Sequence, residues 1–218
     1  MYAVIFDMDG VIFDSEAKVQ ECWEEIAEKY GMNDIQKTCR MCLGSNARVV
    51  EQIFKQQYGE DFDYARFSKK AASLFRERYG QGRLPKKPGI LELLQYLKEH
   101  GIKTAVASST NAQAVRQELE EGGLLSYFDV VVGGDMVTKS KPDPEIFLEA
   151  CKKLQVSPDD AYIIEDSYNG IRAAYLAGSK PIMVPDLLPA TEEMKEKSSI
   201  VLSSLTEVRE WFKEKKEF

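Results

Sequence analysis

Hydrophobic and polar positions follow two different rhythms in the first part of the chain. The apolar run at 3–6 predicts a buried strand over residues 1–8, whereas from Glu16 to about Tyr79 apolar residues recur every three or four positions. The first pattern is typical of a buried strand and the second of amphipathic helices. The sequence therefore predicts one strand followed by a set of helices that has no sheet of its own.

After residue 89 the rhythm changes. Short apolar runs alternate with helical stretches, several of which end at a glycine such as Gly101 or Gly178. Strands are predicted at 103–109, 129–134, 161–167, 181–185 and 200–202, and helices at 90–100, 112–121, 144–154, 169–177 and 205–216. Such alternation predicts an α/β fold, a doubly wound parallel sheet with helices on both faces.

The order of these segments predicts a core that is interrupted by an insert. Residues 1–14 and 87–218 supply the α/β core, and residues 15–86 form an all-helical domain between its first strand and its first long helix. The stretches 13–17 and 80–87 connect the two domains, and we expect them to act as hinges.

Polar residues cluster where the predicted strands end. The first strand ends in FDMDG, a second in ASSTN and a third in IIEDSYNG, while SKPDPE lies in the loop after DVVVGGD. In an open α/β sheet, ligands bind beyond the carboxyl ends of the strands. These segments should therefore bring together Asp7, Asp9, Ser108, Lys141, Glu165 and Asp166.

The charges of this group predict its ligands. Carboxylates that converge on one spot repel one another unless cations offset their charge. Lys141 offsets one charge, and Mg²⁺, which takes oxygen ligands and is often completed by a substrate phosphate, would offset two more. Ser108 and the backbone N–H groups after it can donate to phosphate oxygens. The pattern predicts a site for Mg²⁺ and a phosphate ester.

Asp7 and Asp9 are two positions apart, so both can face the same substrate if the strand continues between them. One carboxylate can attack phosphorus, and the other can protonate the leaving oxygen and later activate water. The spacing does not decide which residue does which.

Four segments together carry a resemblance to a known family. FDMDGVIFDSE, VASST, KSKPDPEIF and YIIEDSYNGIRAAYLAG resemble, in this order, the four motifs of the haloacid dehalogenase (HAD) superfamily. They are most similar to its branch of phosphatases and beta-phosphoglucomutases with a helical cap. The resemblance extends over essentially the whole chain, and it implies that the insert is this cap.

The resemblance implies the roles of the two aspartates. Asp7 matches the nucleophile, which is also a metal ligand, and Asp9 matches the general acid/base, whose backbone carbonyl also binds Mg²⁺. The dehalogenases of the superfamily lack the second aspartate, so Asp9 indicates phosphoryl transfer. The implied activity is Mg²⁺-dependent hydrolysis of a small phosphomonoester through an aspartyl-phosphate.

The other motif residues are assigned by the same resemblance. Ser108, with Ser109 after it, matches the phosphate-binding segment, and Lys141 matches the lysine that steadies the nucleophile and the phosphate. Asp166 matches a metal ligand. Glu165 matches a residue that binds the metal in some relatives and supports its ligands in others, and both roles stay open.

The cap is expected to close over the site, exclude water and set specificity. Gly44, Ser45 and Arg48 lie where relatives present a loop to the substrate. Arg48 could pair with an anionic or sugar group, or be an ordinary surface arginine.

A mutase is the alternative to a phosphatase. Beta-phosphoglucomutases carry a histidine shortly after the first motif and a lysine before the glycine of the cap loop. Here the first stretch reads SEAKVQE, and Leu43 precedes Gly44. Net hydrolysis of a sugar phosphate or similar ester is therefore favoured. A non-catalytic phosphate-binding module is disfavoured because Asp7, Asp9 and Lys141 are all present.

Charge and composition exclude other classes. A net charge of −7 argues against nucleic acid or an anionic membrane as the partner. No apolar stretch is long enough to cross a bilayer, and the N-terminus does not resemble a signal peptide. We expect a cytoplasmic enzyme, a monomer like many relatives. Cys39 and Cys42 form a C-x-x-C pair but lie among helical patterns, so we expect structural thiols.

Overall fold

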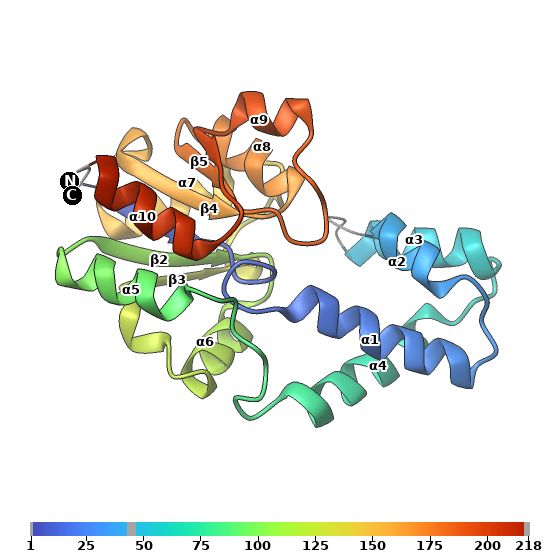
Figure 1. Cartoon of the computed structure of the whole chain (residues 1–218). Helices are drawn as coiled ribbons and strands as arrows, with labels where there is room; N and C mark the ends of the chain where they lie inside the picture. Colours follow the sequence, from blue (N-terminus) through green and yellow to red (C-terminus); the bar gives the residue numbers. More distant parts are fainter. Residues whose placement is uncertain (1, 43–46, 216–218) are drawn as a thin grey trace.

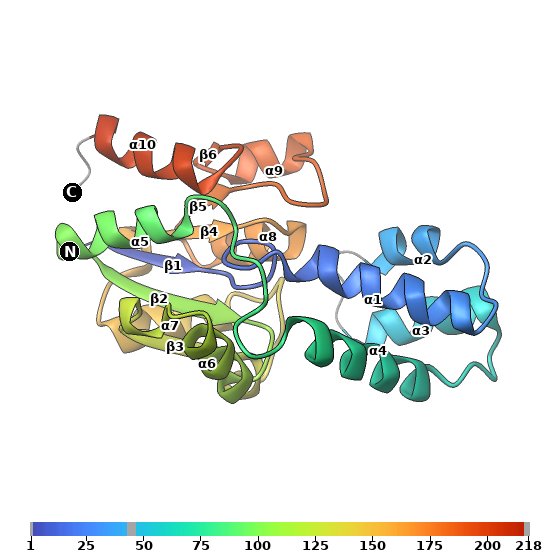
Figure 2. The same ribbon diagram turned by 60° about the horizontal axis from the view of Figure 1, so that its bottom comes forward.

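The computed structural model describes residues 2–42 and 47–215. A parallel sheet lies between layers of helices, and a group of four helices, α1 to α4, projects from one end of it (Figures 1 and 2). The six strands are β1 (Ala3–Phe6), β2 (Lys103–Ser108), β3 (Val130–Gly133), β4 (Ala161–Glu165), β5 (Lys180–Met183) and β6 (Ile200–Val201).

The helices fall into two groups along the chain. Those of the insert are α1 (Ser15–Lys29), α2 (Ile35–Cys42), α3 (Ala47–Tyr58) and α4 (Tyr64–Tyr79). Those of the core are α5 (Ile90–Glu99), α6 (Ala112–Glu121), α7 (Glu145–Leu154), α8 (Tyr168–Leu176), α9 (Glu192–Lys197) and α10 (Leu205–Lys215). Within the core, the short helix α9 and three single-turn 3₁₀ segments, at 125–127, 134–136 and 158–160, are elements that the sequence pattern did not predict.

The sheet has the order β3-β2-β1-β4-β5-β6, and all of its strand pairs are parallel. Phe6 at the end of β1 pairs in register with Val106 of β2 and with Ile164 of β4. The three central strands therefore end at the same edge of the sheet. This arrangement confirms the predicted doubly wound α/β fold.

Alternate residues of β1 serve the two faces of the sheet. Val4 and Phe6 belong to the apolar cluster formed with α5, α6 and α10, whereas Ala3 and Ile5 belong to the cluster formed with α7 and α8. All four side chains are fully buried. A strand covered on both faces must be apolar at every position, which explains the uninterrupted run in the sequence.

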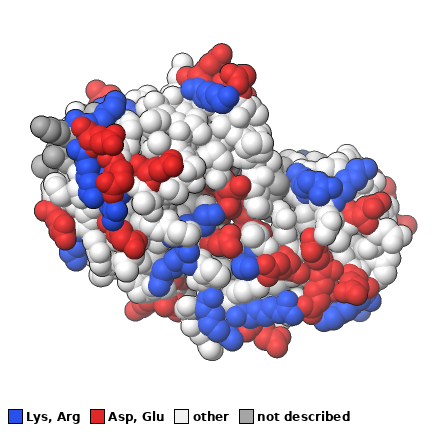
Figure 3. Space-filling view, viewed as in Figure 1, with Lys and Arg blue, Asp and Glu red and all other residues white. Residues whose placement is uncertain are grey.

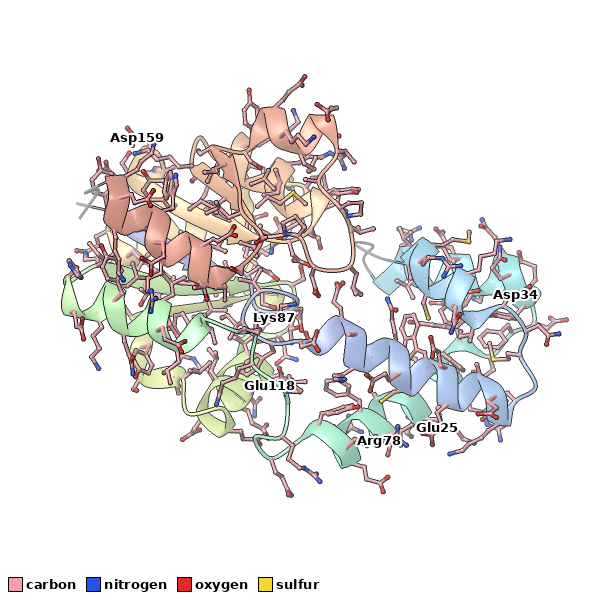
Figure 4. All side chains as sticks on the ribbon, viewed as in Figure 1. Glu25, Asp34, Arg78, Lys87, Glu118 and Asp159 are labelled. Carbon is pink, nitrogen blue, oxygen red and sulfur yellow. The ribbon has the colours of Figure 1, made fainter. Side chains whose placement is uncertain are left out.

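The four helices of the insert have a separate apolar cluster. Phe54 of α3 is fully buried at its centre, where its ring contacts those of Trp23, Tyr64 and Phe67 at centroid distances of 5.0–5.2 Å. Helices α1 and α4 pack side by side (Figure 1). Glu25 and Arg78 form an ion pair between them (Figure 4). The insert thus has its own core, and we propose that residues 15–86 form a cap domain.

The chain enters and leaves the insert along two adjacent segments. A β-bridge pairs Phe13 with Lys86, and the backbone N–H of Asp14 donates to the carbonyl of Pro85 at 2.9 Å. Lys87 lies at this junction (Figure 4), where its ammonium donates to Asp186 of the core at 2.6 Å. The two connections are thereby joined to each other and to the core.

Charged side chains of both signs are interleaved over the face seen in Figure 3, and neither sign covers a continuous area there. An electrostatic footprint for nucleic acid would require a patch of one sign. None of the helices in the described ranges is both long and apolar enough to span a bilayer.

A cavity of about 630 Å³ lies at the junction, between α1 and α4 on one side and α6 on the other. Glu118 of α6 lines it together with apolar side chains such as Phe13 and Leu84 (Figure 4). Burial, with a smaller contribution from the charge of Asp9, raises the pKa of Glu118 from 4.5 to about 7. A carboxylate in this position opposes folding once it is ionised.

We expect Glu118→Gln to stabilise the protein in a pH-dependent way. The protonated Glu118 side chain is favoured by the folded state, because its pKa is about 7 there and 4.5 in the unfolded chain. Its contribution to stability is complete below pH 4.5 and is lost as the pH rises through about 7. After discounting for partial exposure, the variant should gain about 1 kcal/mol in free energy of unfolding at about pH 8, and less at about pH 5. Urea unfolding at both pH values measures this difference. The exposed Glu120→Gln on the same helix is the control, and an equal gain at both pH values would contradict the explanation.

Candidate active site

The carboxylates predicted from the strand ends do meet at one edge of the sheet. Asp7 follows β1 directly, and its backbone N–H donates to the carbonyl of Ile164 at 3.0 Å, which places it beside the end of β4. Glu165 is the last residue of β4, and Asp166 follows it. All three carboxylates are buried. The parallel register therefore explains why residues more than 150 positions apart in the chain share one site.

Lys141 joins two of these carboxylates from the opposite side. Its ammonium lies 2.5 Å from Oδ1 of Asp7 and 2.6 Å from Oε1 of Glu165, and it also donates to the carbonyl of Ala107 at 3.3 Å. Its side chain is only 8% exposed. Burial alone would lower the pKa of Lys141, but the two carboxylates outweigh that effect and raise it. Lys141 is therefore a permanent cation between Asp7 and Glu165.

Glu165 is held at both of its oxygens. Oε1 accepts from Lys141, and Oε2 accepts at 3.0 Å from the backbone N–H groups of Asp166 and Ser167 and from the Ser167 hydroxyl. Gly170 in the first turn of α8 leaves the space for this carboxylate, because a Cβ there would lie 1.8 Å from Oε1. Glu165 had two possible roles, as a direct metal ligand or as a residue that supports the ligands. These contacts favour the second role, in which Glu165 positions Lys141.

Asp9 is fixed by two hydroxyl groups that the sequence analysis did not single out. Ser15, in the first turn of α1, donates to Oδ1 of Asp9 at 2.6 Å, and Thr110 donates to Oδ2 at 3.5 Å. Burial raises the pKa of Asp9, while these two hydrogen bonds act in the opposite direction. A serine or threonine a few residues after a D-x-D motif or a strand end is common in sequences and does not by itself indicate a contact with Asp9. Only the three-dimensional arrangement identifies Ser15 and Thr110.

The carboxylates are costly in this arrangement unless a further cation is present. Burial, followed by mutual repulsion with neighbours that include Glu165, raises the pKa of Asp166 well above its usual range. For Asp7, burial also raises the pKa, and it outweighs the opposing effect of Lys141. A bound divalent cation would reverse this balance by favouring the ionised forms.

The donor set fits a hard divalent cation. Oxygens of Asp7, Glu165 and Asp166 all lie within 4.8 Å of one another. Gly10 allows the loop to approach them closely, because a Cβ there would lie 2.4 Å from Oδ2 of Asp166. Grouped carboxylate oxygens are the ligands that Mg²⁺ prefers. The residues present therefore suit Mg²⁺. Asp7 and Asp166 are the two carboxylates that would provide ligand oxygens.

The segment after β2 lies across the site from Asp166. The hydroxyl oxygen of Ser108 accepts the N–H of Thr110 at 3.1 Å, and Ser108 is fully buried. Ser109 and Thr110 line the cleft above it. Asn111 caps α6 by accepting the N–H of Ala114 at 3.0 Å.

A cleft of about 750 Å³ opens above these residues and extends to the insert. From the core it is lined by Asp7, Asp9 and Lys141, and from the insert by α1, α2, the start of α3 and Tyr64. Arg48, the predicted substrate contact, is exposed and lines this cleft. Gly44 and Ser45, the other two predicted cap residues, lie outside the described residues.

Cys39 and Cys42 also line the cleft, as buried free thiols of α2. Burial raises the pKa of Cys39 to about 12 and that of Cys42 to about 11. Thiols with such values stay protonated at neutral pH and are poor nucleophiles and metal ligands.

The chain is similar to known proteins in sequence and in fold. Residues 4–184 match the family model described as haloacid dehalogenase-like hydrolase. The chain is 37% identical over 182 residues to a phosphorylated carbohydrates phosphatase of Thermotoga maritima, covering 84% of each chain.

Two solved structures share the fold over nearly the whole chain. CbbY from Rhodobacter sphaeroides in complex with phosphate superposes with a TM-score of 0.78 at 27% identity, covering 95% of this chain and 96% of that one. Beta-phosphoglucomutase from Clostridium difficile gives a TM-score of 0.78 at 25% identity, covering 100% and 97%.

We expect Gly170→Ala to disturb the site by displacing Glu165. The added methyl group would overlap the carboxylate, so Glu165 must move away from Lys141. Overpacking of this kind costs about 1–3 kcal/mol in free energy of unfolding, and activity should fall with it. Thermal unfolding and phosphatase assays measure both effects. The control is Leu176→Ala at the end of the same helix, where the leucine is 63% exposed; it should change neither stability nor activity. Unaltered activity in Gly170→Ala would show that Glu165 does not position Lys141.

Proposed function

The chain belongs to the haloacid dehalogenase-like hydrolases, and from this premise we propose that it is a phosphatase. The protein hydrolyses a small phosphomonoester with Mg²⁺ as cofactor, through an aspartyl-phosphate on Asp7. Asp9 acts as general acid and base. The observation that carries this proposal is the buried ion-pair arrangement in which Lys141 holds Asp7 beside Glu165 at the floor of a cleft.

The proposed first half-reaction transfers the phosphoryl group to the protein. A carboxylate oxygen of Asp7 attacks phosphorus, the bond from phosphorus to the ester oxygen breaks, and Asp9 donates a proton to that oxygen. Lys141 orients Asp7 and favours its ionised form. In the second half-reaction Asp9 takes a proton from water, whose oxygen attacks the same phosphorus. Inorganic phosphate leaves, and both aspartates return to their starting states.

Mg²⁺, held by the carboxylates of Asp7 and Asp166 and the backbone carbonyl of Asp9, would neutralise charge on the phosphoryl oxygens. Thr110 and Ser15 orient the Asp9 carboxyl during both proton transfers. Ser108 and Ser109, at the end of β2, bind the phosphoryl group from the other side.

A phosphorylated carbohydrate is the proposed substrate class. The curated relative from Thermotoga maritima carries this activity in its name. The cleft has room for a sugar beside the phosphate, and the cap residues Ser45 and Arg48, with Gly44, are proposed to contact the part of the substrate that carries no phosphate. Cap movement about the joined connections near Phe13 and Lys86 would then admit substrate and exclude water.

Beta-phosphoglucomutase activity is the second candidate, supported by the close structural likeness to such an enzyme. The structure places Val19 and Gln20 of α1 in the lining of the cleft, and the expected histidine is absent from this stretch. Hydrolysis therefore stays the first choice.

Cytoplasmic location and a monomeric state remain predictions. The cysteines are free thiols, which suits a reducing compartment.

We expect phosphate release from p-nitrophenyl phosphate to require both Mg²⁺ and Asp7. Removal of divalent cations with EDTA should abolish activity, and added Mg²⁺ should restore it. Asp7→Asn should lower kcat by about a thousandfold or more, because an amide cannot serve as the nucleophile. Circular dichroism checks that the variant is folded. Activity that survives in folded Asp7→Asn would overturn the nucleophile assignment.

Phosphatase and mutase are separated by the products of beta-glucose 1-phosphate incubated with a trace of glucose 1,6-bisphosphate. A phosphatase releases inorganic phosphate in step with substrate loss, whereas a mutase yields glucose 6-phosphate without stoichiometric phosphate release. Because the chain lacks the histidine after the first motif and the cap-loop lysine that such mutases carry, we expect phosphate. Glucose 6-phosphate as the main product would reverse the order of the two candidates.

A further inference from the structure

We propose that Glu16 selects the charge of the leaving group, so that the cleft accepts esters with a neutral, hydroxyl-rich remainder and rejects those with a second anionic group. This inference rests on the proposed phosphatase function and adds a substrate criterion to it. Esters with a neutral remainder include monophosphates of sugars and polyols. Bisphosphates and phosphorylated carboxylic acids carry the second anionic group.

Glu16 lies at the point where the cleft passes from the core to the insert. It occupies the first turn of α1, lines the cleft, and brings a carboxylate oxygen within 4.8 Å of those of Asp166 and Asp186. Asp186 is paired with Lys87 at 2.6 Å. Glu16 itself forms no hydrogen bond or ion pair within the ranges 2–42 and 47–215. Its charge is therefore directed at whatever enters the cleft.

The position of Glu16 has a simpler explanation that the structure does not favour. An acidic residue in the first turn of a helix is often present because it stabilises the N-terminal end of the dipole. Such stabilisation needs no acidic neighbours, whereas the carboxylate of Glu16 lies within 4.8 Å of oxygens of both Asp166 and Asp186. Glu16 is therefore held in an unfavourable, acidic environment, which a neutral group with hydroxyl donors relieves and an anion worsens.

Gln20 lies one turn further along the same face of α1 and also lines the cleft. Its side-chain nitrogen is buried and, across the described part of the chain, has no hydrogen-bond partner. A buried amide without a partner is costly, and a substrate oxygen is the partner that the cleft can provide. A carboxylate acceptor and an amide donor side by side form a pair suited to neighbouring hydroxyl groups.

The charges around the cleft agree with this selection. The described lining contains the four carboxylates Asp7, Asp9, Glu16 and Asp166, and the two cations Lys141 and Arg48. Residues 43–46, which are not described, carry no charged side chain. Mg²⁺ and the phosphate dianion of the substrate would neutralise each other. Even with Asp9 protonated as the general acid, the other three carboxylates outnumber the two cations, so the remaining field is negative. A second anionic group would enter against that field.

The two cations do not compensate for this field. Lys141 is fully engaged with Asp7 and Glu165. Arg48 is exposed to solvent, where screening reduces its attraction for an anion. Glu16 is partly buried and lies beside the acidic centre, so its charge has the greater effect on the leaving group.

The test uses two esters that differ in one group. Glycerol 3-phosphate and 3-phosphoglycerate share a three-carbon skeleton, but the first ends in a hydroxymethyl group and the second in a carboxylate. Each is measured as a competitor of p-nitrophenyl phosphate hydrolysis with Mg²⁺ present, at about pH 8, well above the ordinary pKa of a glutamate. We expect the inhibition constant of 3-phosphoglycerate to be about tenfold higher or more.

Glu16→Gln should remove most of this difference, mainly by tightening the binding of 3-phosphoglycerate. Glu28→Gln, an exposed site on the same helix with the same chemical change, should leave the ratio as it is in the wild-type protein. Gln20→Leu should weaken the binding of glycerol 3-phosphate more than the binding of 3-phosphoglycerate. The rate with p-nitrophenyl phosphate alone shows whether each variant is folded and active.

The outcomes separate this inference from the proposed function. If the wild-type protein does not hydrolyse p-nitrophenyl phosphate, the proposed function fails. If it does, but 3-phosphoglycerate competes as well as glycerol 3-phosphate, or neither competes, the charge selection is wrong while the phosphatase stands. An unchanged ratio in active Glu16→Gln overturns the role of Glu16. The wild-type ratio decides the charge preference even if that variant does not fold.

Discussion

The site depends on one buried ammonium group shared by two carboxylates. Lys141 reaches Asp7 and Glu165 at hydrogen-bond distance, and none of the three side chains is more than 10% exposed. A buried pair that loses one partner leaves an uncompensated charge, which is strongly destabilising. The loop that carries Lys141, the end of β1 and the end of β4 are therefore held together by the same contacts that orient the nucleophile. Fold stability and chemistry share this set of interactions.

The core of the fold could be predicted because its strands are buried on both faces. Continuous apolar runs such as that of β1 leave little ambiguity, and a glycine closely follows three of the helices between them, α5, α6 and α8. Helix α9 was missed because its EEMKEK sequence is almost wholly polar, and it packs through Met194 alone among its buried residues. A pattern with one apolar position in six does not reveal a helix.

The motif residues of the site were predictable for a different reason. Parallel strands bring their carboxyl ends to one edge, so Asp7, Lys141 and Asp166 could be grouped from the order of segments. Ser15 and Thr110 could not, because their role depends on the path of the loops toward Asp9. Glu16 and Gln20 look like ordinary polar positions of an amphipathic helix. Only the placement of α1 over the sheet edge shows that they face the cleft.

The adjacent connections at Phe13 and Lys86 have a consequence for how such a chain can change. Residues joined by an antiparallel bridge, such as these two, lie only about 5 Å apart, so a tight turn could replace the whole insert without stretching the sheet. Deletion, enlargement or exchange of the helical module would leave every strand pairing intact. The architecture thus separates a core that carries the catalytic residues from an insert that can be exchanged. New specificities can arise by replacing the insert at this one pair of adjacent connections.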